Sequence, residues 1–313
     1  MSIDSSATLQ KAPPLSSTGL GWGLLGVTAF SFTLPFTRVA VADGGMSPLF
    51  AGSGRAVVAA CLAAAALAIT RQRPPRGVQW VRVAVVAGGV VAGFPLLTSF
   101  ALTTAPASHG AVVIALLPAA TAVAAVLRAH ERQPKSFWIT AAVGAVAAVG
   151  FASSQGDGFG GPHPSDLLLF GAVVAAAIGY AEGGLLAREL GAWQTVSWAL
   201  VLSAPPMLLA TVSTLARQPA TGGPAEWAAF AYLGIVSMFL GFFAWYRGLA
   251  IGPMARVGQV QLVQPVMTIG WAVLFLDERV ARPTVLGGVA VIACAAAAVR
   301  TRRGRRTAPG KPR

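Results

Sequence analysis

Residues Gln261–Arg279 read QLVQPVMTIGWAVLFLDER, an apolar stretch of helical length with a proline near its middle and an acidic–basic pair at its end. A second stretch, Ile114–Arg132, reads IALLPAATAVAAVLRAHER. At a constant offset of 147 residues the two share the proline, a threonine, an Ala-Val-Leu run and the final Glu-Arg. Apolar composition alone could produce the Ala-Val-Leu matches, but rarely the proline and the charged pair as well. We therefore infer an internal duplication.

The composition places both copies in a membrane. Of the 313 residues 55% are hydrophobic and only 11% are charged, with a mean hydropathy of +0.69. A soluble domain carries about 25% charged residues. Apolar runs of about 20 residues, the length that crosses a bilayer as a helix, recur along the whole chain. The sequence therefore predicts an all-α integral membrane protein.

The apolar runs predict ten transmembrane helices, five in each copy. The predicted spans are Gly19–Ala42, Pro48–Thr70, Trp80–Thr103, Ala107–Leu127, Phe137–Ser153, Asp166–Ala187, Trp193–Leu215, Glu226–Ala250, Ala255–Phe275 and Thr284–Val299. The chain then divides into an N-terminal segment (1–18), a first repeat (19–153), a loop (154–165), a second repeat (166–299) and a basic tail (300–313). Since five is odd, the two repeats must be inverted relative to each other in the membrane.

The lysines and arginines predict the orientation, because short cytoplasmic loops carry an excess of them. With the N-terminus inside, most basic residues fall in inner segments and the tail. The basic residues left in outer segments are Arg38, Arg217, Arg279 and Arg282. We expect both termini in the cytoplasm. The net charge of +13 then reflects topology, and the tail is expected to lie on anionic lipid of the bilayer rather than on nucleic acid.

Inverted repeats are the architecture of transporters that work by alternating access, with a small-molecule substrate bound near the membrane midplane. A facilitative uniporter or a channel without ion coupling is the alternative. A membrane enzyme is disfavoured, because the sequence has no His/Asp constellation; it also has no cluster of metal ligands. We expect no cofactor and no metal. A homodimer is one assembly that the sequence leaves open.

The second half resembles a known family. Tyr232–Ala295 is similar to the last three helices of an EamA domain, in the drug/metabolite transporter superfamily. The matching marks are Trp245-Tyr246-Arg247 with Leu249, the proline with the Glu278-Arg279 pair, and Gly287-Gly288. The first half repeats the pattern more weakly through Arg55, Pro118 and Glu131. The resemblance implies a ten-helix carrier of the inner (plasma) membrane, usually an exporter of amino acids or other small metabolites.

Glu182 is the sharpest candidate for a functional residue. It lies in the apolar, glycine-flanked stretch IGYAEGGLLARE of the sixth predicted span, and a carboxylate at that depth is costly unless it has a role. No basic residue lies one helical turn away, so we expect Glu182 to load and release a coupling proton. A structural pair with Arg188 is the alternative.

The two matched prolines and two glutamines form a second group of candidates. Pro118 and Pro265 each remove a backbone hydrogen bond, which predicts a hinge or a static kink near the midplane. Gln261 and Gln264 share one face of the ninth span. Their amides could bind a polar substrate or another helix.

Six further residues are candidates for the substrate pathway. Arg55 could neutralise a substrate carboxylate, although we favour a structural role. His109, near the outer end of the fourth span, is more typical of a satisfied interface residue than of a proton carrier. Trp271 lies inside a span and either stacks on a substrate or packs. The other three are Tyr180, Phe94 and Thr98.

Overall fold

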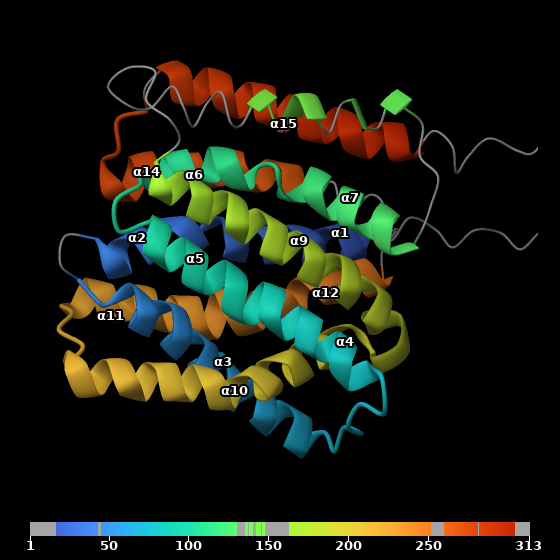
Figure 1. Ribbon diagram of the computed structural model, residues 1–313, viewed down its shortest axis with the longest axis vertical. Helices are drawn as coiled ribbons and strands as arrows, with labels where there is room; N and C mark the ends of the chain where they lie inside the picture. The colour runs from blue at the N-terminus through green and yellow to red at the C-terminus, as the bar shows by residue number, and fades with distance from the viewer. Residues whose placement is uncertain are drawn as a thin grey trace, which may run out of the picture.

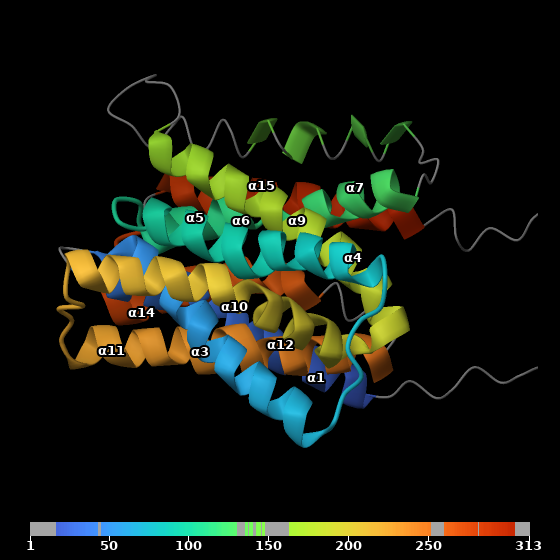
Figure 2. The ribbon, with the colours of Figure 1, turned by 60° about the horizontal axis from the view of Figure 1, so that its bottom comes forward.

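The computed structural model describes residues 17–42, 45–129, 163–251, 260–280 and 282–303, with short pieces between 135 and 147. The regular elements of these residues are all helices, stacked in layers with α15 on one side of the bundle and α3 and α10 on the opposite side (Figures 1 and 2). In chain order they are α1 (Ser17–Ser31), α2 (Thr33–Val41), α3 (Pro48–Ile69), α4 (Gln79–Val86), η1 (Ala87–Gly93), α5 (Phe94–Ala101), α6 (Ala107–Ile114), α7 (Leu117–Ala129), α9 (Pro164–Leu190), α10 (Ala192–Arg217), α11 (Pro224–Ala231), η2 (Tyr232–Leu240), α12 (Gly241–Ile251), η3 (Gln261–Val263), α14 (Gln264–Leu276) and α15 (Arg282–Arg303).

The prediction of an all-helical membrane protein is confirmed over these residues. Seven helical runs are long and apolar enough to cross a membrane, and they correspond to predicted spans one to four and six to eight. The ninth predicted span is described over Gln261–Leu276, a shorter apolar helix, and the tenth corresponds to α15. The fifth, residues 137–153, lies mostly outside the described residues.

The two matched stretches run in opposite directions. Glu278, just after α14, accepts hydrogen bonds from the backbone N–H groups of Ala107 (2.7 Å) and Ser108 (2.9 Å) at the start of α6. The helix of the second copy therefore ends where the helix of the first copy begins. This antiparallel arrangement is what an inverted duplication requires. Glu131, the counterpart of Glu278, lies outside the described residues.

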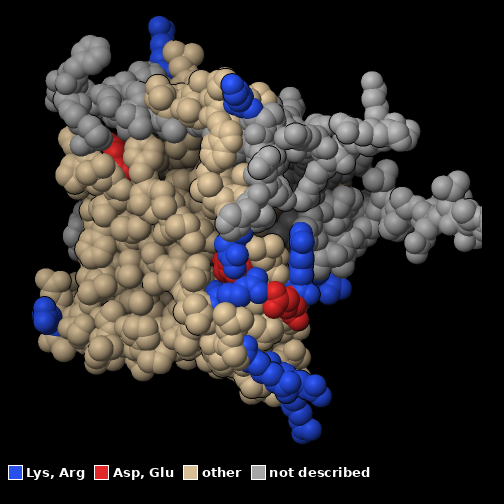
Figure 3. All heavy atoms as spheres, turned by 45° about the vertical axis from the view of Figure 1, so that its right-hand side comes forward, with Lys and Arg blue, Asp and Glu red and all other residues tan. Residues whose placement is uncertain are grey.

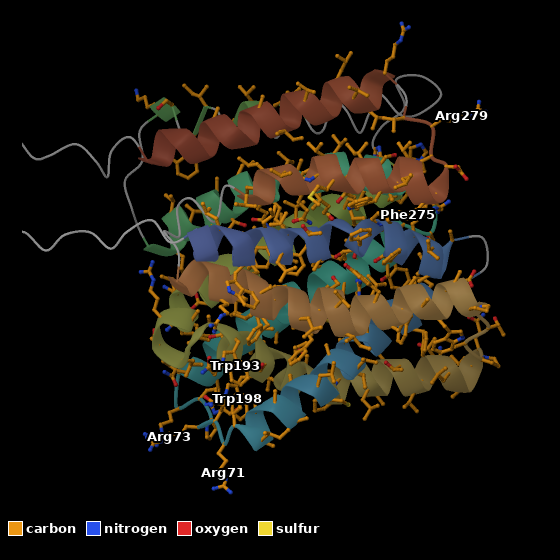
Figure 4. The ribbon with its side chains drawn as sticks, turned by 180° about the vertical axis from the view of Figure 1, so that it is seen from behind. Arg71, Arg73, Trp193, Trp198, Phe275 and Arg279 are labelled. Atoms are coloured by element: carbon orange, nitrogen blue, oxygen red, sulfur yellow. The ribbon has the colours of Figure 1, made fainter. Side chains whose placement is uncertain are left out.

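The bundle has two ends that the rest of the description uses. At the Glu278 end, α14 ends and α6 begins. At the opposite end, which we call the Arg82 end, α4 begins, and α7 and α9 finish. Figure 4 places Arg71 and Arg73 at this second end, far from Phe275 and Arg279.

The duplication also extends to an irregularity of the backbone. The third span of each repeat contains a π-helical segment, η1 in the first and η2 in the second. Shifted by the 147-residue offset, η1 falls on residues 234–240, inside η2. Because π-helix is rare and often found at functional sites, its presence at equivalent places indicates a shared role.

Glycine allows close packing where η1 crosses α9. A Cβ atom on Gly89 would collide with the carbonyl oxygen of Ala175 and lie 3.0 Å from the Cα of Gly179. A second glycine acts at a turn: Gly191, with φ of +98°, is the single residue between α9 and α10. This conformation is one that L side chains rarely adopt.

We predict that Gly89→Ala lowers the unfolding temperature in detergent by several degrees, since overpacking of a tight contact costs about 1–3 kcal/mol. Gly88→Ala is the matched control: it changes the neighbouring residue, whose Cβ would meet nothing within 4 Å. Thermal unfolding of the purified variants measures both. Equal unfolding temperatures for the two variants would contradict the close contact between η1 and α9.

Candidate functional site

A cavity lies inside the bundle, between the two repeats. Both repeats contribute to the wall, which is mostly apolar. The lining residues are Phe30, Thr33, Leu34, Arg55, Val90, Phe94, Pro95, Ile114, Leu117, Ala176, Tyr180, Leu233, Ser237, Met238, Phe242 and Gln264.

A second, smaller cavity adjoins the first and shares four wall residues with it. The shared residues are Leu34, Ile114, Leu117 and Gln264. Pro118, Pro265 and Gln261 also line it. The structure thus brings together the two prolines and two glutamines that the sequence singled out, and it does so at the contact between the copies.

The matched prolines do not kink continuous helices as expected. Pro118 is the second residue of α7, after a break at 115–116 that separates it from α6. Pro265 occupies the first turn of α14, directly after the 3₁₀ turn η3. Proline is well tolerated in a first turn, where its missing N–H has no partner to lose. Both helices are therefore interrupted rather than bent, a feature typical of substrate sites in transporters.

Arg55 is the charged side chain of the large cavity wall. It comes from α3, is only 2% exposed, and has neutral hydrogen-bond acceptors. Its Nη2 donates to the carbonyl oxygen of Pro95 (2.6 Å) and to Thr98 Oγ1 (3.3 Å), and its Nη1 donates to Thr37 Oγ1 (3.2 Å). The expected structural role is present, because these bonds tie α3 to α2 and α5. Thr98 contributes to the site through Arg55.

Hydroxyl groups that sequence reasoning missed complete the polar part of the wall. Thr33 and Ser237 share a hydrogen bond of 2.7 Å between the first span and η2, across the boundary of the repeats. The signal available in the sequence was two hydroxyl residues inside apolar spans, but such residues are common in membrane helices. Only the fold brings these two together.

Aromatic side chains form the apolar part of the wall. Phe242 lies between Phe30 and Tyr180, with ring centroids 4.8 and 6.2 Å away, and it stacks on Tyr246. Phe94 lies on the same wall. Tyr180 and Phe94 are therefore where the pathway interpretation expected them, whereas Phe30 and Phe242 were not predicted.

Trp271 packs between helices and does not line either cavity. Its Nε1 donates to Ser31 Oγ (2.8 Å), and its ring stacks on Phe32 at a centroid distance of 4.5 Å. Of the two interpretations of Trp271, packing is the one that fits these contacts.

Glu182 is paired, so the premise of a lone intramembrane carboxylate is wrong. Arg82 of α4 donates through Nε to one carboxylate oxygen, and Arg128 of α7 donates to the other at 2.7 Å. Arg82 also binds Glu189, which lies about two helical turns after Glu182 in α9. Arg82 and Arg128 lie 100 and 54 residues away in the chain, so inspection of the helix around Glu182 could not find them.

Glu182 also lines neither of the two cavities, whereas Gln261 lines the smaller one. The carboxylate belongs to an ionic cluster of Arg82, Arg128, Glu182 and Glu189 that joins α4, α7 and α9 at the Arg82 end. Figure 3, turned toward this side of the molecule, shows basic side chains gathered around acidic ones. The cluster links helices of both repeats.

The Glu278 end has cross-links of its own. Besides Glu278 on the α6 amides, Arg38 of α2 donates to the carbonyl oxygens of Leu102 (2.9 Å) and Thr103 (2.7 Å), just after α5. His109 Nε2 lies 2.6 Å from Asp166 Oδ1, and both side chains are buried. His109 is thus a buried residue with a hydrogen-bond partner, as its position indicated, and it lines neither cavity.

These features define a membrane transporter: inverted repeats, interrupted helices at their contact, and a cavity between two cross-linked ends. A model of the EamA-like transporter family matches residues 17–153 and 163–300, one copy for each repeat. The chain belongs to this family.

Two similar proteins extend the comparison. The "Uncharacterized transporter YdeK" of Bacillus subtilis (strain 168) is 46% identical over 290 residues, which cover 91% of this chain and 99% of that protein. A crystal structure of another protein, 19% identical, covers 94% of this chain and 99% of its own with a TM-score of 0.61. The similarity to this crystal structure shows that the two proteins share a fold.

We predict that Glu182→Gln lowers the unfolding temperature by several degrees, because it leaves two arginines without their buried carboxylate. Glu189→Gln is the matched control, since it removes a carboxylate that is 46% exposed and pairs with the same Arg82. An exposed ion pair contributes little, so the control should unfold like the wild type. A Glu182→Gln variant as stable as the wild type would contradict a stabilising role for the pairing of Glu182 with the two arginines.

Proposed function

We propose that the chain is a secondary active transporter of ten helices, which moves a small metabolite out of the cell by alternating access. The observation that carries this proposal is the cavity at the contact between two antiparallel repeats. A site between inverted repeats can be presented to either side by rocking one repeat against the other. The site itself then needs little rearrangement.

The two ends supply the groups that such a motion must separate. The cluster of Arg82, Arg128, Glu182 and Glu189 holds the Arg82 end together, and Glu278 with Arg38 holds the other end. An alternating-access cycle would open one set while the other remains closed. In this proposal Glu182 is part of a gate. The coupling ion, if a proton, is then carried by another group or by the substrate.

A facilitative uniporter or a channel is the competing proposal. The test uses purified protein in proteoliposomes with a pH gradient of either sign. A secondary active carrier coupled to protons accumulates substrate against its gradient, and the direction reverses with the sign of the pH difference. Flux that only equilibrates the substrate, whatever the pH gradient, would favour the uniporter. Loss of saturation with rising substrate would favour the channel.

Pro265→Ala should slow transport severalfold while leaving membrane insertion normal. Alanine supplies a backbone N–H that can bond to the carbonyl oxygen of Gln261 and continue α14 backward through η3. The matched control is Pro206→Ala, because Pro206 is exposed inside α10 and lines neither cavity. Initial rates in proteoliposomes measure both. Wild-type rates in Pro265→Ala would mean that the interruption serves packing alone.

The orientation proposed here has both termini in the cytoplasm of a cell whose inner membrane holds the protein. A reporter that is active only in the cytoplasm should work when fused after Arg313 or after Lys135, and fail after Asp157. The expected pattern follows from the excess of basic residues in the proposed inner segments. Equal reporter activity after Asp157 and Arg313 would overturn the inverted topology.

A further inference from the structure

The wall of the large cavity carries a positive charge that no carboxylate balances. Arg55 is only 2% exposed, and its acceptors are the hydroxyls and the carbonyl oxygen described above. Among the described residues, the ion pairs involve Arg82, Arg128 and His109, and none involves Arg55. A charge removed from water is costly unless it is paired. The guanidinium of Arg55 is therefore a buried cation without a charged partner among the described residues.

One nitrogen of the same guanidinium also lacks a hydrogen bond. Arg55 Nε is buried and has no acceptor, whereas the two Nη atoms both have one. Buried donors are rarely left without a partner, so this one calls for an explanation. An anionic ligand in the cavity would supply both the missing acceptor and the missing negative charge.

The other groups of the cavity wall indicate the chemical character of the rest of such a ligand. The other polar groups are neutral: the Thr33–Ser237 hydroxyl pair, the Gln264 amide and the Tyr180 phenol. Aromatic and aliphatic side chains cover the remaining surface. Among the described residues that line the cavity, none is an aspartate or glutamate that could balance an ammonium group. The free space within this wall is small, so the ligand is a small molecule.

We propose that Arg55 binds the carboxylate of a small monocarboxylate with an apolar body, and that the cavity prefers this net negative ligand to the corresponding amino acid. The proposal rests on the proposed function, in that the cavity is taken as the transport site. A monoanion neutralises Arg55. A zwitterion brings an additional positive charge that no lining residue balances, and an amine adds to the positive charge already present.

The main test uses the wild-type protein in detergent and needs no variant to fold. Isothermal titration compares four ligands on one skeleton: phenylpropionate, phenylalanine, phenylpropionamide and phenylpropylamine. A second set on the branched skeleton of leucine repeats the comparison with an aliphatic body. We expect the carboxylate to bind best, the amino acid less well, and the amide and the amine about tenfold or more weakly, as loss of a charged hydrogen bond implies.

Three outcomes would overturn the proposal. They are an amide that binds as tightly as the carboxylate, an amino acid that binds more tightly than the carboxylate, and a failure of every ligand in both sets to bind. The first would remove the role of Arg55 as an anion site, and the second would refute the charge argument. The third would show that the cavity takes another class of ligand.

Arg55→Lys tests the residue itself, with Arg217→Lys as the matched control. Lysine keeps the charge but lacks the planar guanidinium and its Nε–H, so affinity for the carboxylates should fall about tenfold. Arg217 is exposed in the last turn of α10 and lines neither cavity, so its variant should bind like the wild type. Unchanged carboxylate affinity in folded Arg55→Lys would contradict the assignment. If that variant does not fold, the wild-type ligand series decides.

The binding test and the transport test can fail separately. Carboxylates that bind in the expected order without any flux in proteoliposomes would overturn the proposed function and leave the ligand site in place. Driven flux of another solute, together with no binding of either carboxylate, would overturn the ligand assignment and leave the transporter in place.

Discussion

The interior of this protein is organised by the need to satisfy a buried guanidinium. Arg55 sits in α3 between α2 and α5, and inside a bilayer there is little water to solvate it. Its hydrogen bonds to Thr37, to the Pro95 carbonyl and to Thr98 bring three helices of the first repeat to fixed positions. Arg55 also lines the cavity, and its Nε has no hydrogen-bond acceptor. One residue thus provides a structural connection and a feature of the ligand site.

The helices around the cavity are irregular where they border it. The first span breaks at Phe32, η1 and η2 widen the third span of each repeat, and α6–α7 and η3–α14 are interrupted before their prolines. Irregular backbone inside a membrane is tolerated where protein buries it or where it lines a cavity. In contrast α9, which crosses the bundle as one helix of 27 residues, provides the surface against which η1 packs through Gly89 and Gly179.

The charged residues of the spans are divided between the cavity and the two ends. The ends hold paired charges: Arg82 and Arg128 on Glu182 at one, and Glu278 on the α6 amides at the other. Paired charges at the ends can separate into water when an end opens. The charge of Arg55 lies in the middle of the bundle and cannot separate into water in this way. In the proposal above, an anionic ligand in the cavity balances it. This division supports the proposed roles of gates at the ends and a ligand site between them.

The amino-acid sequence by itself determined the class of the fold, the duplication and the family, because these depend on hydropathy and on local motifs that repeat at one offset. It also singled out Pro118, Pro265, Gln261 and Gln264 as candidates, and the fold brings these four residues to one cavity. What it could not determine were contacts between segments far apart in the chain. Glu182 looked unpaired within its own helix, yet α4 and α7 bring Arg82 and Arg128 to it.

The same limit applies to Arg55. Its neighbours in the sequence show that a basic residue lies in an apolar helix, but they show neither its hydrogen-bond acceptors nor the cavity. For the same reason, the sequence did not predict Thr33, Ser237 and Phe242 as residues of the cavity wall. Hydrophobicity and periodicity are properties of single segments, and they decide which segments become helices and which cross a membrane. The partner of a buried charge is decided by the packing of several helices in three dimensions, and here only the tertiary structure determined it.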